Sequence, residues 1–178
     1  MGRLHFLYRN STMLDFSCQK MLCNALMQPH LDYCSSSWHS SLTAQLRSRL
    51  DIVQRKMARF VYALDNRAHI GNKELCFLSW LNFPDCVNYF KLVHLFKIRL
   101  GSAPQYLLSD FTLLSNSHGY HTRGSKANFH VSKLLSTAPS SFAFTSVKQW
   151  NNLPDWIKAV SSLTTFKKRL KEHFFSQY

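Results

Sequence analysis

The sequence predicts a mainly α fold: a helical bundle with a small β-hairpin and a basic C-terminal helix. Apolar residues recur every three or four positions in several segments of residues 1–108 and again after residue 160. Two shorter segments, ANFHVSKLL and SSFAFTSVKQW, alternate apolar and polar residues around the turn-like STAPSS, which indicates two short strands. Hydrophobic residues make up 46% of the 178 residues, enough to fill one core.

We expect three parts along the chain. Residues 1–108 form the helical region, residues 109–125 a surface loop, and residues 126–178 the hairpin and the final helix. The loop assignment depends on the small polar residues of SDFTLLSNSHGYHTRG, which favour turns and irregular structure.

The first helix with a clear pattern is expected in FSCQKMLCNALMQPHLDYCSSSW, after Asp15 or Ser17. Pro29 should kink or end this helix, because proline has no N–H and crowds the preceding turn. The apolar residues at mixed three and four spacings are Phe16, Met21, Leu22, Ala25, Leu26 and Met27.

The strongest helical signal lies in LTAQLRSRLDIVQRKMARFVYAL. Its apolar residues alternate steps of four and three, which places them on one stripe of a helix, while the cations fall on the opposite side. The basic side is either a solvated surface or a surface that meets phosphates, and the pattern alone leaves both open. The stripe consists of Leu46, Leu50, Val53, Met57, Phe60 and Leu64, and the cations are Arg49, Arg55, Lys56 and Arg59.

Two further helices are expected. DCVNYFKLVHLFKIRLGSAP is apolar on nearly every side, which is typical of a central helix. Gly101 can adopt the left-handed conformation after its end, and Pro104 prevents its continuation. The tail SSLTTFKKRLKEHFF begins with serines that can cap a helix. Its apolar face consists of Leu163, Phe166, Leu170 and Phe174, and its cations Lys167, Lys168 and Lys171 lie beside or opposite that face.

The charge of the chain is strongly positive and unevenly distributed. Lys and Arg number 22 against nine Asp and Glu, and the formal net charge is +13. Residues 41–70 carry +4 and residues 111–178 carry +7. A basic surface favours polyanionic partners, nucleic acid first. No run approaches the roughly 18 apolar residues of a spanning helix, so any membrane role is expected to be peripheral.

The five cysteines are odd in number and lack the spacing of a disulfide framework. The N-terminal MGRLHFLYRN also lacks the apolar core of a secretory signal. We therefore expect a reduced intracellular compartment. Because no clear basic import run is visible, the sequence leaves nucleus and cytoplasm open.

The stretch HLDYCSSSWH has the composition of an active site, but its spacing does not support one. Zinc would need cysteines brought together by a turn of two to four residues. Cys18 and Cys23 are instead five positions apart in a helical pattern, which separates their directions by about 140°. The candidate ligands were Cys18, Cys23, His30 and Cys34, and we predict no metal site there.

No catalytic residue is predicted either. Cys34 with His30 or His39 supplies the residue types of a nucleophile pair, but an activating pKa shift and an orienting group are not visible in a sequence. The acidic residues do not cluster and no Gly-rich phosphate loop is present. The stretch QWNNLPDWI is interpreted as architecture: Trp150 and Trp156 as buried anchors, with Asn151, Asn152 and Pro154 forming a turn.

An ordered set of motifs gives the chain a family resemblance. The motifs are LHFLYRNSTML, LMQPHLDYCSSSW, LDIVQRKMARFV, LSWLNF, LFKIRLGSAPQYL, YHTRG and SFAFTSVKQWNNLPDWIKAVSSLTTFKKRLKEHFF. In this order they resemble the C-terminal part of reverse transcriptases of non-LTR retrotransposons, the LINE elements of the Jockey, CR1 and L2 type. The resemblance covers almost the whole chain.

The resemblance implies that residues 1–108 are a thumb-like region, which grips the template and primer duplex in such RNA-directed DNA polymerases. The palm and fingers would be its protein partner, and RNA and DNA its ligands. The palm aspartates that hold Mg²⁺, usually in an FADD-like motif, are absent from this sequence, so the chain alone is not expected to polymerise and needs no cofactor. The HLDYCSSSWH stretch is then structural, with Tyr33 and Trp38 packed and Asp32 capping or pairing locally.

The expected nucleic-acid contacts are Arg49, Arg55, Lys56 and Arg59 on the central basic helix and Lys167, Lys168 and Lys171 on the last one. The chain departs from its relatives at Ser79, where they typically have Gly before Trp, and at Cys86, where they commonly carry Arg. A lost cation weakens any contact made there. The alternative is a helical protein-interaction module, or an inert remnant of a decayed transposable element.

Overall fold

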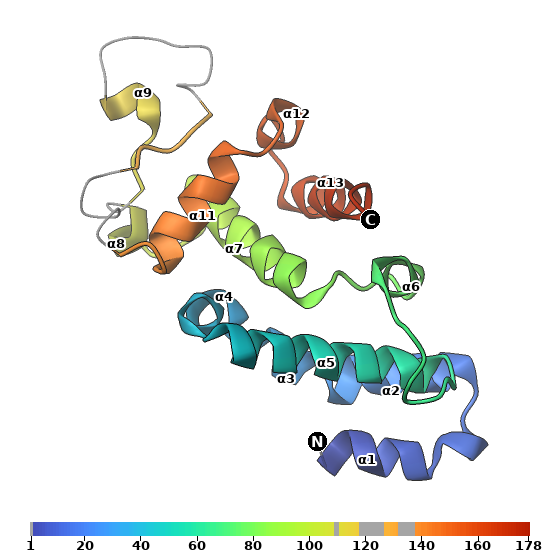
Figure 1. Cartoon of the computed structure of the whole chain (residues 1–178). Helices are drawn as coiled ribbons and strands as arrows, with labels where there is room; N and C mark the ends of the chain where they lie inside the picture. Colours follow the sequence, from blue (N-terminus) through green and yellow to red (C-terminus); the bar gives the residue numbers. More distant parts are fainter. Residues whose placement is uncertain (1, 109–110, 118–126, 132–137) are drawn as a thin grey trace. The chain divides into compact units, whose positions relative to one another are not determined.

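The computed structural model describes residues 2–108, 111–117, 127–131 and 138–178, and these are mostly helical (Figure 1). The predicted mainly α class is therefore confirmed. The helices are α1 (Gly2–Arg9), α2 (Phe16–Leu26), α3 (Gln28–Asp32), α4 (Ser35–Trp38), α5 (Ala44–Val61), α6 (Asn72–Phe77), α7 (Phe83–Arg99), α8 (Gln105–Leu108), α9 (Leu114–Ser117), α11 (Phe142–Asn151), α12 (Asp155–Lys158) and α13 (Leu163–Phe175). Two 3₁₀ turns, Ser11–Met13 and His39–Ser41, complete the list.

The chain forms two compact units. The boundary falls inside α7, between Cys86 and Val87, so this helix contributes to both. The first unit comprises Met1–Ser35, Leu42–Cys86 and Gln177–Tyr178, and the second unit comprises Ser36–Ser41 and Val87–Ser176. The stretch expected to be a loop contains the short helix α9, and residues 109–110 and 118–126 of it lie outside the described residues.

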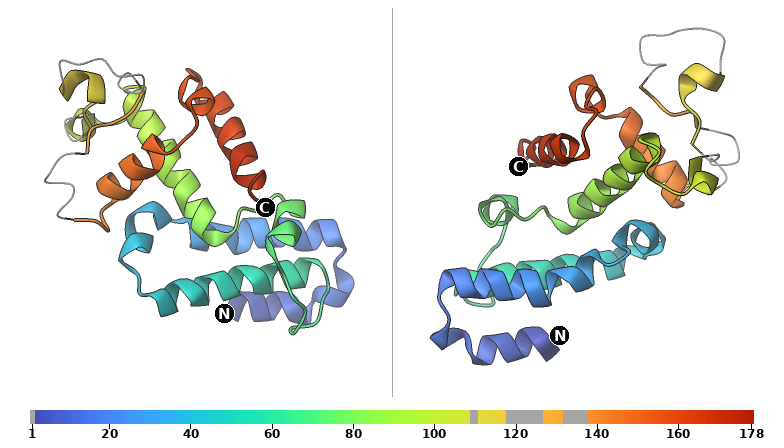
Figure 2. Two further views of the ribbon diagram at one scale, coloured as in Figure 1. Left: turned by 45° about the horizontal axis from the view of Figure 1, so that its top comes forward. Right: turned by 180° about the vertical axis from the view of Figure 1, so that it is seen from behind.

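In the first unit α1, α2 and α5 lie side by side (Figure 2). The carboxylate of Asp15 caps α2 by accepting a hydrogen bond from the Cys18 amide, so the predicted start is confirmed. The helix ends at Leu26, and Pro29 falls in the first turn of α3, where its missing N–H is tolerated. Met57 and Phe60 of α5 are fully buried in this core.

The first turn of α7 also belongs to the first unit. Asn82 caps it by accepting from the Asp85 amide, while the Tyr178 hydroxyl accepts from the Asn82 amide at 2.8 Å. The same hydroxyl donates to the Asp85 carboxylate at 2.9 Å. Burial raises the pKa of Tyr178, so this hydroxyl stays protonated and able to donate.

The second unit is built around stacked aromatic rings. The rings of Phe96 in α7 and Phe166 in α13 stack with centroids 4.1 Å apart, and Trp150 in α11 lies 5.7 Å from Phe166. Gly101, with φ of +69°, ends α7 as predicted. The apolar face expected for the last helix is confirmed at Phe166, Leu170 and Phe174, which are buried.

The expected β-hairpin is wrong. Its second strand is the helix α11, which Ser141 caps by accepting from the Phe144 amide at 3.2 Å. Residues 127–131 form one isolated antiparallel bridge, between Phe129 and Leu113, and residues 132–137 lie outside the described part. The alternation was misleading because Val147 and Trp150, three positions apart, also share a helical face.

Candidate nucleic-acid interface

Helix α5 carries the central basic surface. Thr43 caps its start by accepting from the Leu46 amide, and the helix runs 18 residues to Val61. The predicted apolar stripe is buried only in its second half, at Met57 and Phe60. Leu50 and Val53 are half-buried, whereas the stripe positions at both ends, Leu46 and Leu64, are exposed.

Two of the four predicted cations on α5 are available for a ligand. Arg49 is exposed and Lys56 is half-buried. Counted over the residues that the structure describes, neither side chain makes a hydrogen bond or an ion pair. At about 100° per residue, the two positions lie within roughly 20° of each other around the helix axis, about two turns apart. They therefore define a short row of cations along one edge of the apolar stripe, about 20–40° from Phe60 and 80–100° from Met57 around the axis.

The other two cations are engaged inside the protein. The Arg55 Nε donates to the Asp51 carboxylate at 2.8 Å, and its Nη1 donates to the backbone carbonyl of Ile70. The Arg59 Nε donates to the backbone carbonyl of Ala68 at 2.7 Å. These arginines hold the segment of residues 62–71, named here the α5–α6 loop, against the helix. The sequence could not distinguish them from Arg49 and Lys56.

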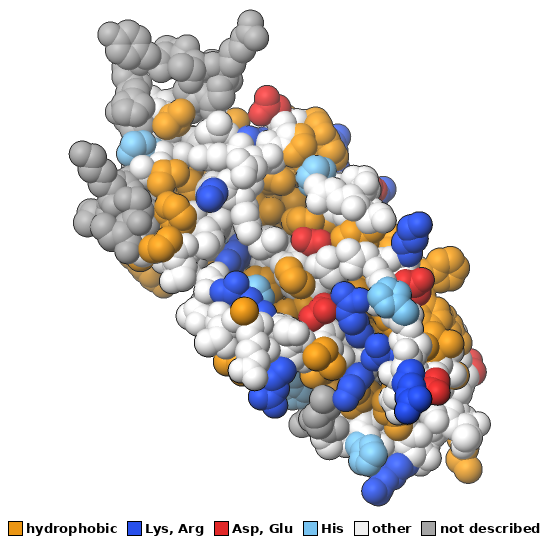
Figure 3. Space-filling view, in the orientation of Figure 1, with side chains coloured by type: hydrophobic (Ala, Val, Ile, Leu, Met, Phe, Trp, Pro, Cys, Tyr) orange, Lys and Arg blue, Asp and Glu red, His pale blue; other side chains and the backbone are white. Residues whose placement is uncertain are grey.

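Figure 3 shows Lys and Arg side chains gathered over the region where Figure 1 places the second half of α5 and the start of α6. Acidic side chains and histidines lie among them. The surface is therefore mixed rather than uniformly positive. The number of its cations that can meet a phosphate depends on which of them are already paired.

Helix α13 presents a second, separate basic face. Lys167 and Lys168 are exposed and make no hydrogen bond or ion pair with the described residues. The Lys171 ammonium lies 5.5 Å from the ring centroid of Phe175, close enough for a cation–π contact. Ser162 occupies the position before this helix, but its side chain caps nothing, contrary to the expectation.

Within the HLDYCSSSWH stretch, Asp32 is held by two neighbouring side chains. The half-buried Asp32 accepts hydrogen bonds from Gln28 at 3.0 Å and from the Cys86 thiol at 3.4 Å, so the expected local pairing is present. Burial raises the pKa of Asp32. Tyr33 is 77% exposed because Leu31 takes the buried position of α3, so its expected packing is wrong. Trp38 is half-buried.

The cysteines of this region differ in exposure. Cys23 is buried, which raises the pKa of its thiol to about 12, while Cys34 is exposed with φ of +50°. No group of three or more His, Cys, Asp or Glu side chains able to hold a metal ion occurs among the described residues.

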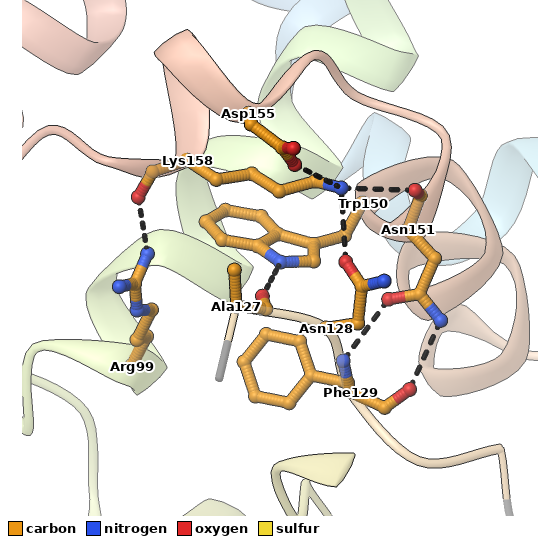
Figure 4. Close-up of polar contacts among 8 residues, drawn as sticks. All are labelled: Arg99, Ala127, Asn128, Phe129, Trp150, Asn151, Asp155 and Lys158. Atoms are coloured by element: carbon orange, nitrogen blue, oxygen red, sulfur yellow. Dashed lines mark hydrogen bonds and ion pairs between the residues drawn. The ribbon is translucent and has the colours of Figure 1, made fainter. Parts of the chain in front are cut away.

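A polar cluster around Trp150 was read correctly as architecture (Figure 4). Trp150 is buried and its indole N–H donates to the Ala127 carbonyl at 2.8 Å. The Asn151 side chain accepts from the Phe129 amide and donates to the Phe129 carbonyl, which replaces a strand partner. Trp156, expected to be a buried anchor, is 50% exposed because Ile157 takes the core position of α12.

Sequence reasoning missed three internal cations in the second unit. Lys158 is 2% exposed, and its ammonium donates to the Asn128 side chain and the Asn151 carbonyl, both at 2.9 Å. Arg99 donates to the Lys158 carbonyl at 2.6 Å and lies over the Trp150 ring. Lys91 is 3% exposed and donates to the hydroxyls of Ser40 and Thr145. Lys91 and Lys158 are too deeply buried to meet a ligand at the surface, and Arg99 is half-buried.

Comparison with family models, with curated proteins and with solved structures found no significant match to this chain. Among the described helices, none has both the length and the apolar character needed to cross a bilayer.

Proposed function

We propose that this chain binds the sugar-phosphate backbone of nucleic acid as the thumb-like C-terminal region of a non-LTR retrotransposon reverse transcriptase. The observation that carries the proposal is the pair Arg49 and Lys56, which α5 holds along the edge of its apolar stripe and whose side chains have no internal partners among the described residues. Lys167 and Lys168 on α13 supply a second basic face.

Cations on a helix surface contact phosphates without reading the bases. Such contacts position a protein on a duplex and carry no sequence information. Binding is therefore expected to be nonspecific and to weaken with salt, each neutralised phosphate contributing about 0.9 to the slope of log K against log salt on duplex DNA. A template and primer hybrid of RNA and DNA is the proposed natural ligand.

The chemistry of polymerisation is assigned to another part of the parent protein. Two-metal phosphoryl transfer needs paired carboxylates around Mg²⁺, and the nine acidic residues of this chain contain no such pair in sequence. We therefore propose that the chain serves a palm and fingers region as its protein partner. Primer extension by the purified chain with Mg²⁺ and nucleotides would contradict this assignment.

The binding proposal is tested with the full chain and fluorescent hybrids of unrelated sequences. Fluorescence anisotropy between about 50 and 200 mM salt should give similar affinities for all sequences and a linear log-log dependence. The double variant Arg49→Gln/Lys56→Gln should lower the slope by about 1.8. The matched control is Lys20→Gln/Lys148→Gln, which removes the same charge elsewhere. Equal slopes for both double variants would overturn the proposal.

A second candidate function, protein interaction, is favoured by exposed apolar side chains in the first unit. Phe77 at the end of α6 is 81% exposed, and Phe6 and Met13 are also largely exposed. In an inert remnant of a transposable element, these side chains would be exposed without any partner protein. Translation of the genomic sequence upstream distinguishes these cases: an open frame with paired palm aspartates supports the polymerase, and a frame full of stops supports the remnant.

A further inference from the structure

We infer that the α5–α6 loop is itself part of the nucleic-acid surface: Arg55 and Arg59 position it, and Arg67 and Lys73 contact the phosphates. This inference rests on the proposed function and deepens it. It changes which residues of the basic region are expected to touch the ligand, since two of the four cations predicted on α5 act through the loop.

The spacing of the two arginines along α5 matches the spacing of the two loop carbonyls that they bind. Arg55 binds the carbonyl of Ile70 and Arg59 binds the carbonyl of Ala68, so the chain returns antiparallel to α5. Four helical residues advance about 6 Å. Two residues of extended chain span about 6.6 Å, which matches that advance. The loop therefore lies along the side of α5 that carries both arginines.

The two arginines are partly committed to the protein. Asp51 balances the charge of Arg55 at 2.8 Å, and both residues are half-buried and donate to backbone carbonyls. Loss of these donors would leave polar backbone groups of a half-buried segment without partners. The role in which Arg55 and Arg59 are observed is therefore to position the loop.

Carboxylates of the loop and of α6 accept hydrogen bonds from its backbone and keep their negative charge. Glu74 accepts from the Gly71 amide at 2.8 Å, and hydrogen bonds from its own amide and that of Gly71 lower the pKa of its carboxyl. Asp65 accepts from the Arg67 amide at 3.3 Å. The Tyr62 hydroxyl donates to the Glu74 carbonyl, and Ile70 is buried, so the loop is fixed at several points.

Exposed cations flank residues 68–71, the part of the loop that Arg55, Arg59 and Glu74 hold. Arg67 precedes Ala68, and Lys73 follows Gly71 in the first turn of α6. Both side chains are exposed, and with respect to the described residues neither makes a hydrogen bond or an ion pair. The fixed backbone holds them without the disorder of a free loop, which lowers the entropic cost of binding. Their chemistry suits phosphate oxygens.

Single substitutions test the contacts. Arg67→Gln and Lys73→Gln should each lower the log-log salt slope on the hybrid by about 0.9. Lys148→Gln, an exposed cation of α11, is the control with the same loss of charge and should leave the slope unchanged. A slope for Arg67→Gln and Lys73→Gln equal to that of the control would overturn the inference, whether or not any other variant folds.

A double-mutant cycle tests the positioning role of Arg59. Arg59→Met keeps the aliphatic stem and removes the donor to Ala68. If Arg59 acts through the loop, Arg59→Met weakens binding in the wild-type background but has no further effect in Arg67→Gln/Lys73→Gln. Additive losses would show a direct contact by Arg59 and would contradict the positioning role. Circular dichroism melts identify a variant that fails to fold, and Arg59→Lys then replaces it.

The outcomes separate this inference from the proposed function. If the wild-type chain shows no salt-dependent binding, the proposed function fails. If the wild type binds and Arg49→Gln/Lys56→Gln lowers the slope, while Arg67→Gln and Lys73→Gln behave like the control, only the role of the loop fails.

Discussion

At the scale of single residues, the structure differs most from the sequence analysis in the state of charged side chains. Lys91 and Lys158 are buried, and Arg55 is tied to Asp51 and Ile70. A lysine at a helical position looks the same in sequence whether it is solvated or bound to carbonyls, because its partners come from distant segments. Asn128, for example, lies 30 positions from Lys158.

Asp32 offers a test at this scale. Its partly buried carboxyl has a raised pKa, so folding favours the neutral form. That contribution is complete below the ordinary pKa of aspartate, near 3.9, and is lost as pH rises through the raised value. Asp32→Asn keeps an acceptor for Gln28 and Cys86 and should raise the melting temperature at pH 7. The gain should shrink towards pH 4, and an unchanged melting temperature at pH 7 would contradict it.

At the scale of elements, helix starts with a side-chain cap and a helical period could be predicted, and short alternating segments could not. The start of α2 at Asp15 and the end of α7 at Gly101 follow from local chemistry. The sequence of α11 fits both the two-residue period of a strand and the 3.6-residue period of a helix. The Ser141 cap and the packing of Trp150 against Phe96 and Phe166 decide its helical state, and this packing joins distant segments that a local pattern does not relate.

Ser141 and Ser162 each occupy the position before a helix, so their alanine variants can be compared directly. Ser141→Ala removes the hydroxyl that accepts from the Phe144 amide and should destabilise the protein by roughly 0.5–2 kcal/mol. Ser162→Ala should cost much less, because the Ser162 side chain caps no amide. Urea unfolding of both variants measures the difference. Equal losses would mean that the Ser141 hydrogen bond contributes little.

At the scale of the whole molecule, the composition predicted a filled core but not its division. Each unit has its own buried residues, with Met57 and Phe60 in the first and Phe96, Trp150 and Phe166 in the second. The sequence does not reveal the boundary within α7. A continuous apolar helix has the same local pattern whether its packing partners stay the same or change along its length. Likewise, the basic segments identified where cations are concentrated, but not which of them are free to bind.

The division into units predicts uneven local stability. Trp150→Ala removes the central ring of the second unit, and such substitutions of buried aromatics typically cost about 3–5 kcal/mol. Amide hydrogen exchange should then accelerate in α11 and α13 much more than in α2 and α5. A uniform acceleration across all four helices would instead show that the chain unfolds as one cooperative body.

The internal cations affect two properties of nucleic-acid binding differently, the rate of encounter and the lifetime of the complex. Arg55, Arg59, Lys91, Arg99 and Lys158 still add to the long-range field that attracts a polyanion, because burial does not remove their charge from the molecule. Lys91 and Lys158 are too buried for close contacts at the surface, and the half-buried Arg55, Arg59 and Arg99 have part of their donors engaged internally. The rate of encounter with a nucleic acid should therefore reflect the full +13, whereas the lifetime of the complex depends on the smaller set of outward-facing cations.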